Sequence, residues 1–200
     1  MPKGKFIIFE GPDGSGQTTQ ASLLADSLTK AGKNIFLTKE PADELDKGII
    51  RSILRSKNKV SLETLELYFT ANRGHHLDAQ IKPALDRGKW VVCDRYFFST
   101  LAFGMLEIDY RWLWEINSKF VVPDLTFFLD VPADVCMDRL QRRGGERELF
   151  EQEQKLDQVI KNYKEVFGKN QFPNVFIIDG DRDIGIIAKE IWGIVSARLK

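Results

Sequence analysis

The fold is decided by one stretch, residues 6–19, which reads FIIFEGPDGSGQTT. It opens with four apolar, β-prone residues, which are typical of a buried strand. Glycines and a proline follow, and these residues favour a tight turn. Beyond the turn, Leu23, Leu24 and Leu28 recur at helical spacing. The stretch therefore predicts a strand, a glycine-rich turn and an amphipathic helix in direct succession.

The turn fits the phosphate-binding pattern G-x-x-x-x-G-[K]-[ST] at every position except the lysine, where Gln17 stands. Its glycines let backbone N–H groups curl around phosphate oxygens, and the helix that follows presents its positive N-terminal end to the same anion. Thr18 stands where a hydroxyl is expected to bind Mg²⁺. A plain strand-to-helix turn is the alternative. The residues expected at the donor phosphates are Gly11, Pro12, Asp13, Gly14, Ser15, Gly16, Gln17, Thr18 and Thr19.

Gln17 is the main departure from this pattern. The usual lysine supplies a positive charge during phosphoryl transfer, whereas glutamine donates a hydrogen bond without charge. Loss of one preorganised electrostatic contact costs about 10²–10³ in rate. Three explanations stay open. The enzyme is slow or another cation substitutes, the chain binds nucleotides without turning them over, or Gln17 is a deliberate substitution. Backbone contacts to phosphate do not need the lysine, so nucleotide binding survives in each.

The rest of the chain alternates short apolar runs with stretches of helical spacing. The runs are Phe6 to Phe9, Ile35 to Leu37, Trp90 to Cys93, Leu125 to Leu129, and Val175 to Ile178. They lack strict alternation, which favours strands buried on both faces of a parallel sheet. One helical stretch carries Ile186, Ile187, Ile191 and Ile194. The alternation predicts an α/β fold, and without linkers or repeats we expect residues 1–200 to form a single domain.

Composition narrows the function classes. Lys plus Arg and Asp plus Glu both number 29, so the formal net charge is zero and nucleic acid is not an expected partner. No apolar run approaches the roughly 18 residues of a membrane span, and the N-terminus leaves no room for a signal peptide. We expect a cytoplasmic protein without membrane contact. Cys93 and Cys136 are expected to be buried thiols, not a disulfide.

Two charged residues follow the third apolar run. Ligands of such folds bind at the C-terminal ends of the strands. Arg95 is placed to clamp a phosphate in a bidentate way, and a surface arginine in a salt bridge is the alternative. Asp94 ends the strand, where a carboxylate can reach a metal through water. We expect Asp94 and Thr18 to form the metal site.

Phe69 and Arg73 are four residues apart, so they share one face of a helix. An aromatic ring can stack on a base while a guanidinium group hydrogen-bonds to its edge. The alternative is that Phe69 packs in the core with Leu65 and Leu62.

These motifs, in this order and spacing, resemble the thymidylate kinase family along nearly the whole chain. The matching segments are Phe9 to Gly16, Thr38 to Pro41, Phe69 to Arg73, Ile81 to Leu85, Cys93 to Tyr96 with Ser99, Pro123 to Val131, and a helix from Phe150 to Tyr163. The resemblance implies a P-loop kinase fold with a five-stranded parallel sheet and helices on both faces. It also implies a homodimer.

The resemblance also implies site roles. Asp13 faces the acceptor sugar and the metal shell, Arg95 holds the monophosphate and the moving group, and Phe69 with Arg73 hold thymine. Ser99 belongs to the acceptor site, and Phe103 takes the place of an aromatic residue that favours deoxyribose. The family often reads Arg-Glu-Pro-Gly-Gly-Thr where this chain has residues 39–44, KEPADE.

Four arginines surround Gly144 and Gly145 in a predicted lid at about residues 142–150. They are Arg139, Arg142, Arg143 and Arg147. Glycines between helical stretches indicate a mobile break. Arginines there would close over ATP and stabilise the moving charge. We therefore expect Arg143 and Arg147 to be catalytic and Arg139 to contact the donor. The alternative is a solvated loop in which Glu146, Glu148 and Glu151 pair with the arginines.

The reaction expected is transfer of the γ-phosphoryl group of Mg-ATP to dTMP, with Asp13, Gln17 and Arg95 beside the reacting groups and no covalent intermediate. Two alternatives stay open. One is a catalytically silent nucleotide-binding protein, and the other is a kinase for another nucleoside or monophosphate.

Overall fold

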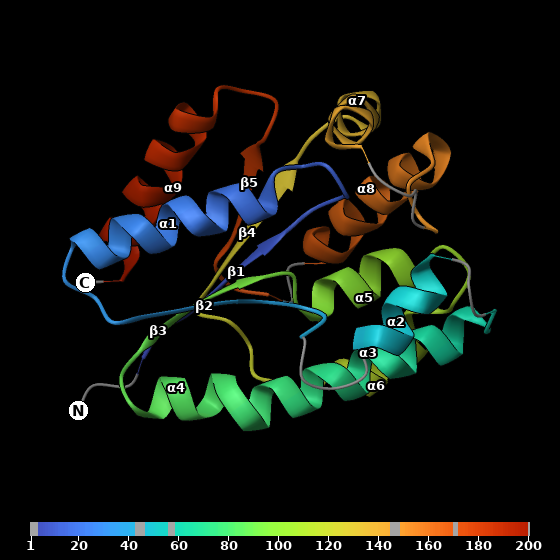
Figure 1. The fold of residues 1–200 in the computed structure, drawn as a ribbon, viewed down its shortest axis with the longest axis horizontal. Helices are drawn as coiled ribbons and strands as arrows, with labels where there is room; N and C mark the ends of the chain where they lie inside the picture. The colour runs from blue at the N-terminus through green and yellow to red at the C-terminus, as the bar shows by residue number, and fades with distance from the viewer. Residues whose placement is uncertain (1–3, 43–46, 56–58, 145–148, 170–171, 200) are drawn as a thin grey trace.

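A computed structural model describes residues 4–42, 47–55, 59–144, 149–169 and 172–199. Five parallel strands form one sheet in the order β2-β3-β1-β4-β5 (Figure 1). The strands are β1 (Phe6–Glu10), β2 (Ile35–Lys39), β3 (Trp90–Asp94), β4 (Leu125–Asp130) and β5 (Val175–Asp179). Each predicted strand is present, and each extends one or two residues further than its apolar run. The extra residues are polar or charged, and two of them, Glu10 and Asp94, are nevertheless buried.

Burial on both faces is confirmed for the three central strands and is wrong for the two outer ones. β1 is buried throughout, while β2 and β5 are partly exposed. Leu37 of β2 is 45% exposed and Ile177 of β5 is 57% exposed. β2 and β5 are the edges of the sheet, so fewer elements cover them.

Helices cover both faces of the sheet (Figure 1). One face carries α1 (Gln17–Lys30) and α9 (Ile184–Arg198). Leu24 and Leu28 of α1 pack with Ile191 of α9 against the sheet. The predicted stripe is confirmed for Ile187 and Ile191, but Ile186 is 54% exposed because it points away from the sheet.

The opposite face carries the larger helical layer. Its elements are α2 (Lys47–Leu54), α3 (Leu62–His76), the π-helical turn η1 (Leu77–Ile81), α4 (Lys82–Asp86), α5 (Phe97–Gly104), α6 (Tyr110–Asn117) and α8 (Glu153–Gly168). This layer packs on β1 and β3 through a cluster rich in aromatic rings. α8 begins at Glu153, not at Phe150 as expected. α7 (Ala133–Arg143) follows β4 and packs against α8 through Leu140 and Leu156.

Parallel pairing brings the ends of distant strands together. Phe9 of β1 pairs with Asp94 of β3, and the Arg95 backbone N–H donates to the Phe9 carbonyl at 2.9 Å. The turn after β1 therefore lies beside the residues that follow β3, at the edge where ligands of such sheets bind.

Cys93 and Cys136 are free and buried, as predicted. Among the described residues, no helix is both long and apolar enough to cross a membrane.

Candidate active site

The turn between β1 and α1 has the geometry of an anion cradle. Gly16 caps α1 with φ 95° and no side-chain hydrogen bond, so no side chain of the cap occupies the first amides of the helix. Gly14 has φ 87°, and a Cβ there would lie 2.6 Å from the carbonyl oxygen of Cys136. Any residue with a side chain at this position would collide with α7.

Gln17 folds back into this cradle. Its side chain is buried, and Nε2 donates to the carbonyl oxygen of Gly11 at 2.5 Å. The same oxygen accepts a hydrogen bond from Nη1 of Arg95 at 3.0 Å. The amide therefore holds the turn without bringing a charge to it.

The expected metal pair is brought together. Oγ1 of Thr18 donates to Oδ2 of Asp94 at 2.5 Å. Oδ1 of Asp94 is buried and has no hydrogen-bond partner among the described residues. A hydroxyl beside a carboxylate with a free oxygen is a donor set that suits Mg²⁺, directly or through its water shell. The two residues therefore fit the metal that the phosphate loop implies.

Arg95 links the loop to the sheet edge. Its backbone has φ 69°, in the left-handed region. Nη2 donates to Oδ1 of Asp13 at 2.6 Å, and Nη1 donates to Oγ of Ser99 at 3.2 Å. Burial lowers the pKa of Arg95, but the carboxylate of Asp13 and other acidic neighbours raise it to a net value above the ordinary range. The guanidinium group therefore stays charged beside Asp13 and the glycine-rich turn.

Glu10, which the sequence did not single out, is a buried carboxyl group that accepts hydrogen bonds from the residues following β3 and from α8. Its oxygens accept hydrogen bonds from the backbone N–H of Tyr96 at 2.8 Å, Oγ of Ser99 at 2.7 Å and the hydroxyl of Tyr163 at 2.9 Å. Burial raises its pKa to about 7, although these bonds and the charge of Arg95 lower it. Glu10 fixes the turn after β3. Its place directly before the glycine-rich turn was the signal that could have found it.

An apolar cavity of about 130 Å³ lies beside Arg95. Phe69 and Phe103 line it, and the guanidinium carbon of Arg95 lies 5.4 Å from the centre of the Phe103 ring. Phe69 also packs against the core, as the alternative weighed from the sequence expected. The remaining lining residues are Asp13, Glu40, Pro41, Leu54, Glu66, Arg73, Tyr96, Ser99, Thr100 and Phe150.

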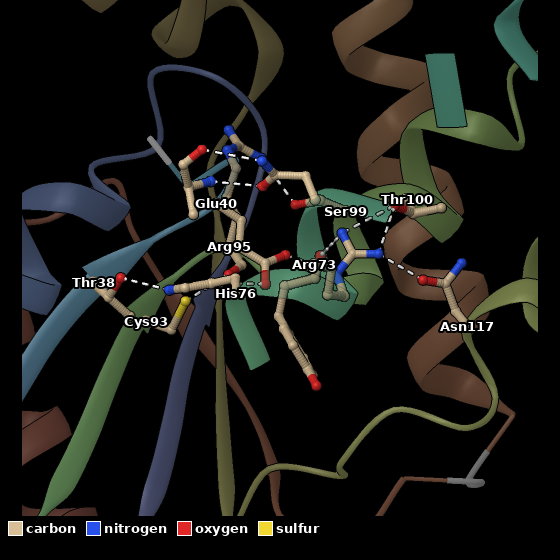
Figure 2. Close-up of polar contacts among 12 residues, drawn as sticks. Thr38, Glu40, Arg73, His76, Cys93, Arg95, Ser99, Thr100 and Asn117 are labelled. Atoms are coloured by element: carbon tan, nitrogen blue, oxygen red, sulfur yellow. Dashed lines mark hydrogen bonds and ion pairs between the residues drawn. The ribbon is translucent and has the colours of Figure 1, made fainter. Parts of the chain in front are cut away.

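Arg73 lies in the wall of this cavity but is only 2% exposed. Figure 2 shows its guanidinium group hydrogen-bonded to Thr100 and Asn117. Nε donates to Glu40 at 2.7 Å, and Nη1 donates to Asn117 at 2.6 Å and to Thr100 at 3.2 Å. Nη2 donates to Thr100 at 3.1 Å and to the Tyr96 carbonyl at 3.3 Å. These contacts use all five N–H groups of a guanidinium.

Glu40 continues this network towards β2 and β3 (Figure 2). Its Oε1 lies 3.3 Å from Nδ1 of His76, whose Nε2 lies 2.8 Å from the hydroxyl of Thr38. The network is buried and holds α3 against the sheet. The sequence did not reveal it, because its members come from four separate segments.

A second and larger cavity of about 630 Å³ surrounds the glycine-rich turn. Arg139 reaches it and donates to the carbonyl of Gly180 at 3.1 Å. Arg143 also lines it and forms an ion pair of 2.8 Å with Glu151, as the solvated-loop alternative expected. Arg147, with Gly145, Glu146 and Glu148, lies outside the described residues. Further cations that the sequence did not single out line this cavity: Lys39, Arg51 and Arg182. Arg182 follows β5. Because ligands of parallel sheets bind at the C-terminal ends of the strands, this position could have singled it out from the sequence.

A glycine-rich loop at a helix N-terminus, a Thr–Asp pair that suits a divalent metal and a basic cavity on this parallel sheet are the features of a nucleotide site of the P-loop kinase class. The sequence profile described as "Thymidylate kinase" matches residues 9–191, and the chain belongs to that family.

Curated relatives cover nearly the whole chain. A "Probable thymidylate kinase" from Pyrococcus horikoshii is 39% identical over 98% of this chain and 98% of its own length. A "Thymidylate kinase" from Desulfotalea psychrophila is 36% identical over 98% of this chain and 96% of its own length. One from Thermomicrobium roseum is 33% identical with the same coverage, 98% and 96%.

Proposed function

We propose that this chain transfers the γ-phosphoryl group of ATP to dTMP, giving ADP and dTDP. The observation that carries the proposal is that the two cavities adjoin: both are lined by Asp13, Glu40, Pro41, Leu54 and Arg95, and Arg95 is the cation among these shared residues. One cavity is apolar and bounded by aromatic rings, which suits a base and sugar. The other is basic and surrounds the phosphate loop, which suits a triphosphate. The acceptor phosphate and the γ-phosphate would therefore meet at Asp13 and Arg95.

The reaction needs no covalent intermediate. An oxygen of the dTMP phosphate attacks the γ-phosphorus, and the bond between that phosphorus and the β–γ bridging oxygen breaks, so ADP leaves. Arg95 lies where it would hold the acceptor phosphate and the moving group. Asp13 orients Arg95 through their ion pair. Thr18 and Asp94 would hold Mg²⁺, which neutralises charge on the donor phosphates when bound.

Phe69 and Phe103 would enclose the acceptor base and sugar, and Ser99 would help to place Arg95. Donor contacts would come from the backbone of Gly11 to Thr19, with Arg139 beside Ser15. We further propose that Arg143 and Arg147 act from a lid at about residues 142–150 over a single kinase domain.

Two properties of the whole protein extend the proposal. Leu67 of α3 is 48% exposed and Ile49 of α2 is 41% exposed, and these apolar side chains on neighbouring helices support a homodimer through the helical layer. Light scattering on the purified protein would test this.

We also place the protein in the cytoplasm, in keeping with its free thiols and its nucleotide substrates.

A second function is favoured by one observation. Gln17 brings no charge and is engaged with the Gly11 carbonyl, which fits a protein that binds nucleotides without turnover. The test is ADP formation from Mg-ATP with a panel of acceptors: dTMP, dUMP, dCMP, dAMP, dGMP and thymidine. Turnover with dTMP above the others would support the proposal. Preference for another acceptor would contradict the substrate, and tight binding of ATP and dTMP without ADP formation would favour the silent protein.

A further inference from the structure

Glu66 is the unpaired acid of the acceptor cavity. It lies on α3 three residues before Phe69 and seven before Arg73, so the three side chains share one face and all line the cavity. Glu66 is 1% exposed, and neither carboxyl oxygen has a hydrogen-bond partner among the described residues. A buried carboxyl group without partners is costly, so such groups call for a specific explanation.

The other charged side chains of the cavity are already paired. Asp13 is bonded to Arg95, and Glu40 is bonded to Arg73. The five N–H groups of Arg73 all donate to protein oxygens in this structure. Among the described charged side chains that line the cavity, Glu66 is the one whose carboxyl oxygens have no partner at hydrogen-bond distance.

The protonation state of Glu66 decides what it can offer. Burial raises its pKa to about 8, and the charge of Arg73 and a contact with Thr100 lower it less. The charged groups that face it are Arg73 on its own helix, Glu40 after β2, and the Asp13–Arg95 pair across the cavity, while α5 and α2 present the uncharged Thr100 and Leu54. At neutral pH the carboxyl group is therefore mostly protonated, with one O–H donor and one acceptor oxygen side by side.

We propose that Glu66 reads the edge of the acceptor base, accepting a hydrogen bond from N3–H and donating one to O4 of the thymine ring. The two atoms of the base are adjacent and present one donor and one acceptor, which matches the two oxygens of a neutral carboxyl group. An ionised carboxylate loses the donor and places negative charge against O4. The inference rests on the proposed function, because it assumes that dTMP occupies this cavity.

The test is calorimetric titration of dTMP into the full-length protein at about pH 7 and about pH 9, so that it does not depend on turnover. From the pKa of about 8, the neutral fraction falls about tenfold across this range, and the Kd of the unaltered protein should rise about tenfold. Glu66→Gln keeps one donor and one acceptor and cannot ionise, so its Kd should change much less. Glu66→Leu should bind dTMP at least tenfold more weakly than the unaltered protein at about pH 7, and its Kd should change little between the two pH values.

The matched control is Glu63→Gln, an exposed acid in the first turn of the same helix, which should keep the pH dependence of the unaltered protein. Ionisation of dTMP itself affects all variants equally, so the comparison with Glu66→Gln removes it. Unfolding curves establish that each variant is folded. An equal loss of affinity with pH in the unaltered protein and Glu66→Gln would overturn the inference and leave the proposed function intact. No binding of dTMP by the unaltered protein at pH 7 would overturn the proposed acceptor, and the inference with it.

Discussion

The side-chain amide of Gln17 donates to the carbonyl oxygen of Gly11 at 2.5 Å. Arg95 donates to that same oxygen at 3.0 Å, so one carbonyl joins the donor loop to the residue placed at the acceptor phosphate. The position that lacks the lysine is therefore occupied by a structural contact, and the geometry of the loop is kept.

Gln17→Lys should raise turnover with ATP and dTMP. An ammonium group would add the charge that glutamine lacks, and one preorganised electrostatic contact is worth about 10²–10³ in rate. The measurement is ADP formation with dTMP by the variant and the unaltered protein under identical conditions. Gln17→Met, which is uncharged and donates no hydrogen bond, is the control and should not gain activity. Equal rates for the unaltered protein and Gln17→Lys would show that other cations of the cavity already supply the charge.

Thr18→Val should weaken Mg²⁺-dependent nucleotide binding about tenfold or more, because valine removes the hydroxyl that faces Asp94. Thr18→Ser keeps the hydroxyl and should keep most of the affinity. Titration of ADP with Mg²⁺, and again with a chelator, measures the effect. If Thr18→Val bound Mg-ADP as the unaltered protein does, the metal would have to lie elsewhere.

Arg95→Gly and Arg95→Ala should both lose most activity but differ in stability. Residue 95 has φ 69°, which glycine adopts freely and alanine does not. The glycine variant should therefore be more stable than the alanine variant by about 1 kcal/mol. Urea unfolding of the two variants gives the difference, and a more stable alanine variant would mean that the turn relaxes.

Glu66 should make stability fall as the pH rises. Its pKa is raised from 4.5 to about 8 in the folded protein, so between these values the unfolded chain releases a proton that the folded chain keeps. The free energy of unfolding then decreases with pH, by at most about 1.4 kcal/mol per pH unit for this group. Glu66→Gln should lose this part of the slope, whereas Glu63→Gln should keep it. Urea unfolding between about pH 5 and pH 8 measures the slopes; parallel curves for the Glu66→Gln and unaltered proteins would contradict the prediction.

Arg143→Ala, alone and with Arg147→Ala, should lower turnover by about 10² if these arginines stabilise the moving charge. Arg143 lines the donor cavity, although Glu151 pairs with it here. Arg142→Ala is the matched control, since Arg142 is exposed and does not line that cavity. Equal turnover in the Arg143 and Arg142 variants would favour the solvated loop.

Local patterns predicted the strands and the phosphate loop well. Each strand came from a short apolar run, and the loop residues are adjacent in sequence. The exposure of Leu37 and Ile177 was not predicted, because the order of strands decides which are edges and a run of five residues does not encode it.

The acceptor cavity was predicted in part. Helical spacing paired Phe69 with Arg73, and the same spacing extended one turn backwards would have added Glu66. The engagement of Arg73 by Glu40, Thr100 and Asn117 depends on how α3, α5 and α6 pack, and no local pattern carries that information.

The strand order has a consequence for how the protein gains its activity. β1 lies between β3 and β4, which come from much later in the chain, and the site forms only where these ends meet. Such long-range pairings are slow to form because a large loop must close first. Nucleotide binding should therefore appear late in folding and in a single step. Binding of the ligand would then report that the sheet has fully formed.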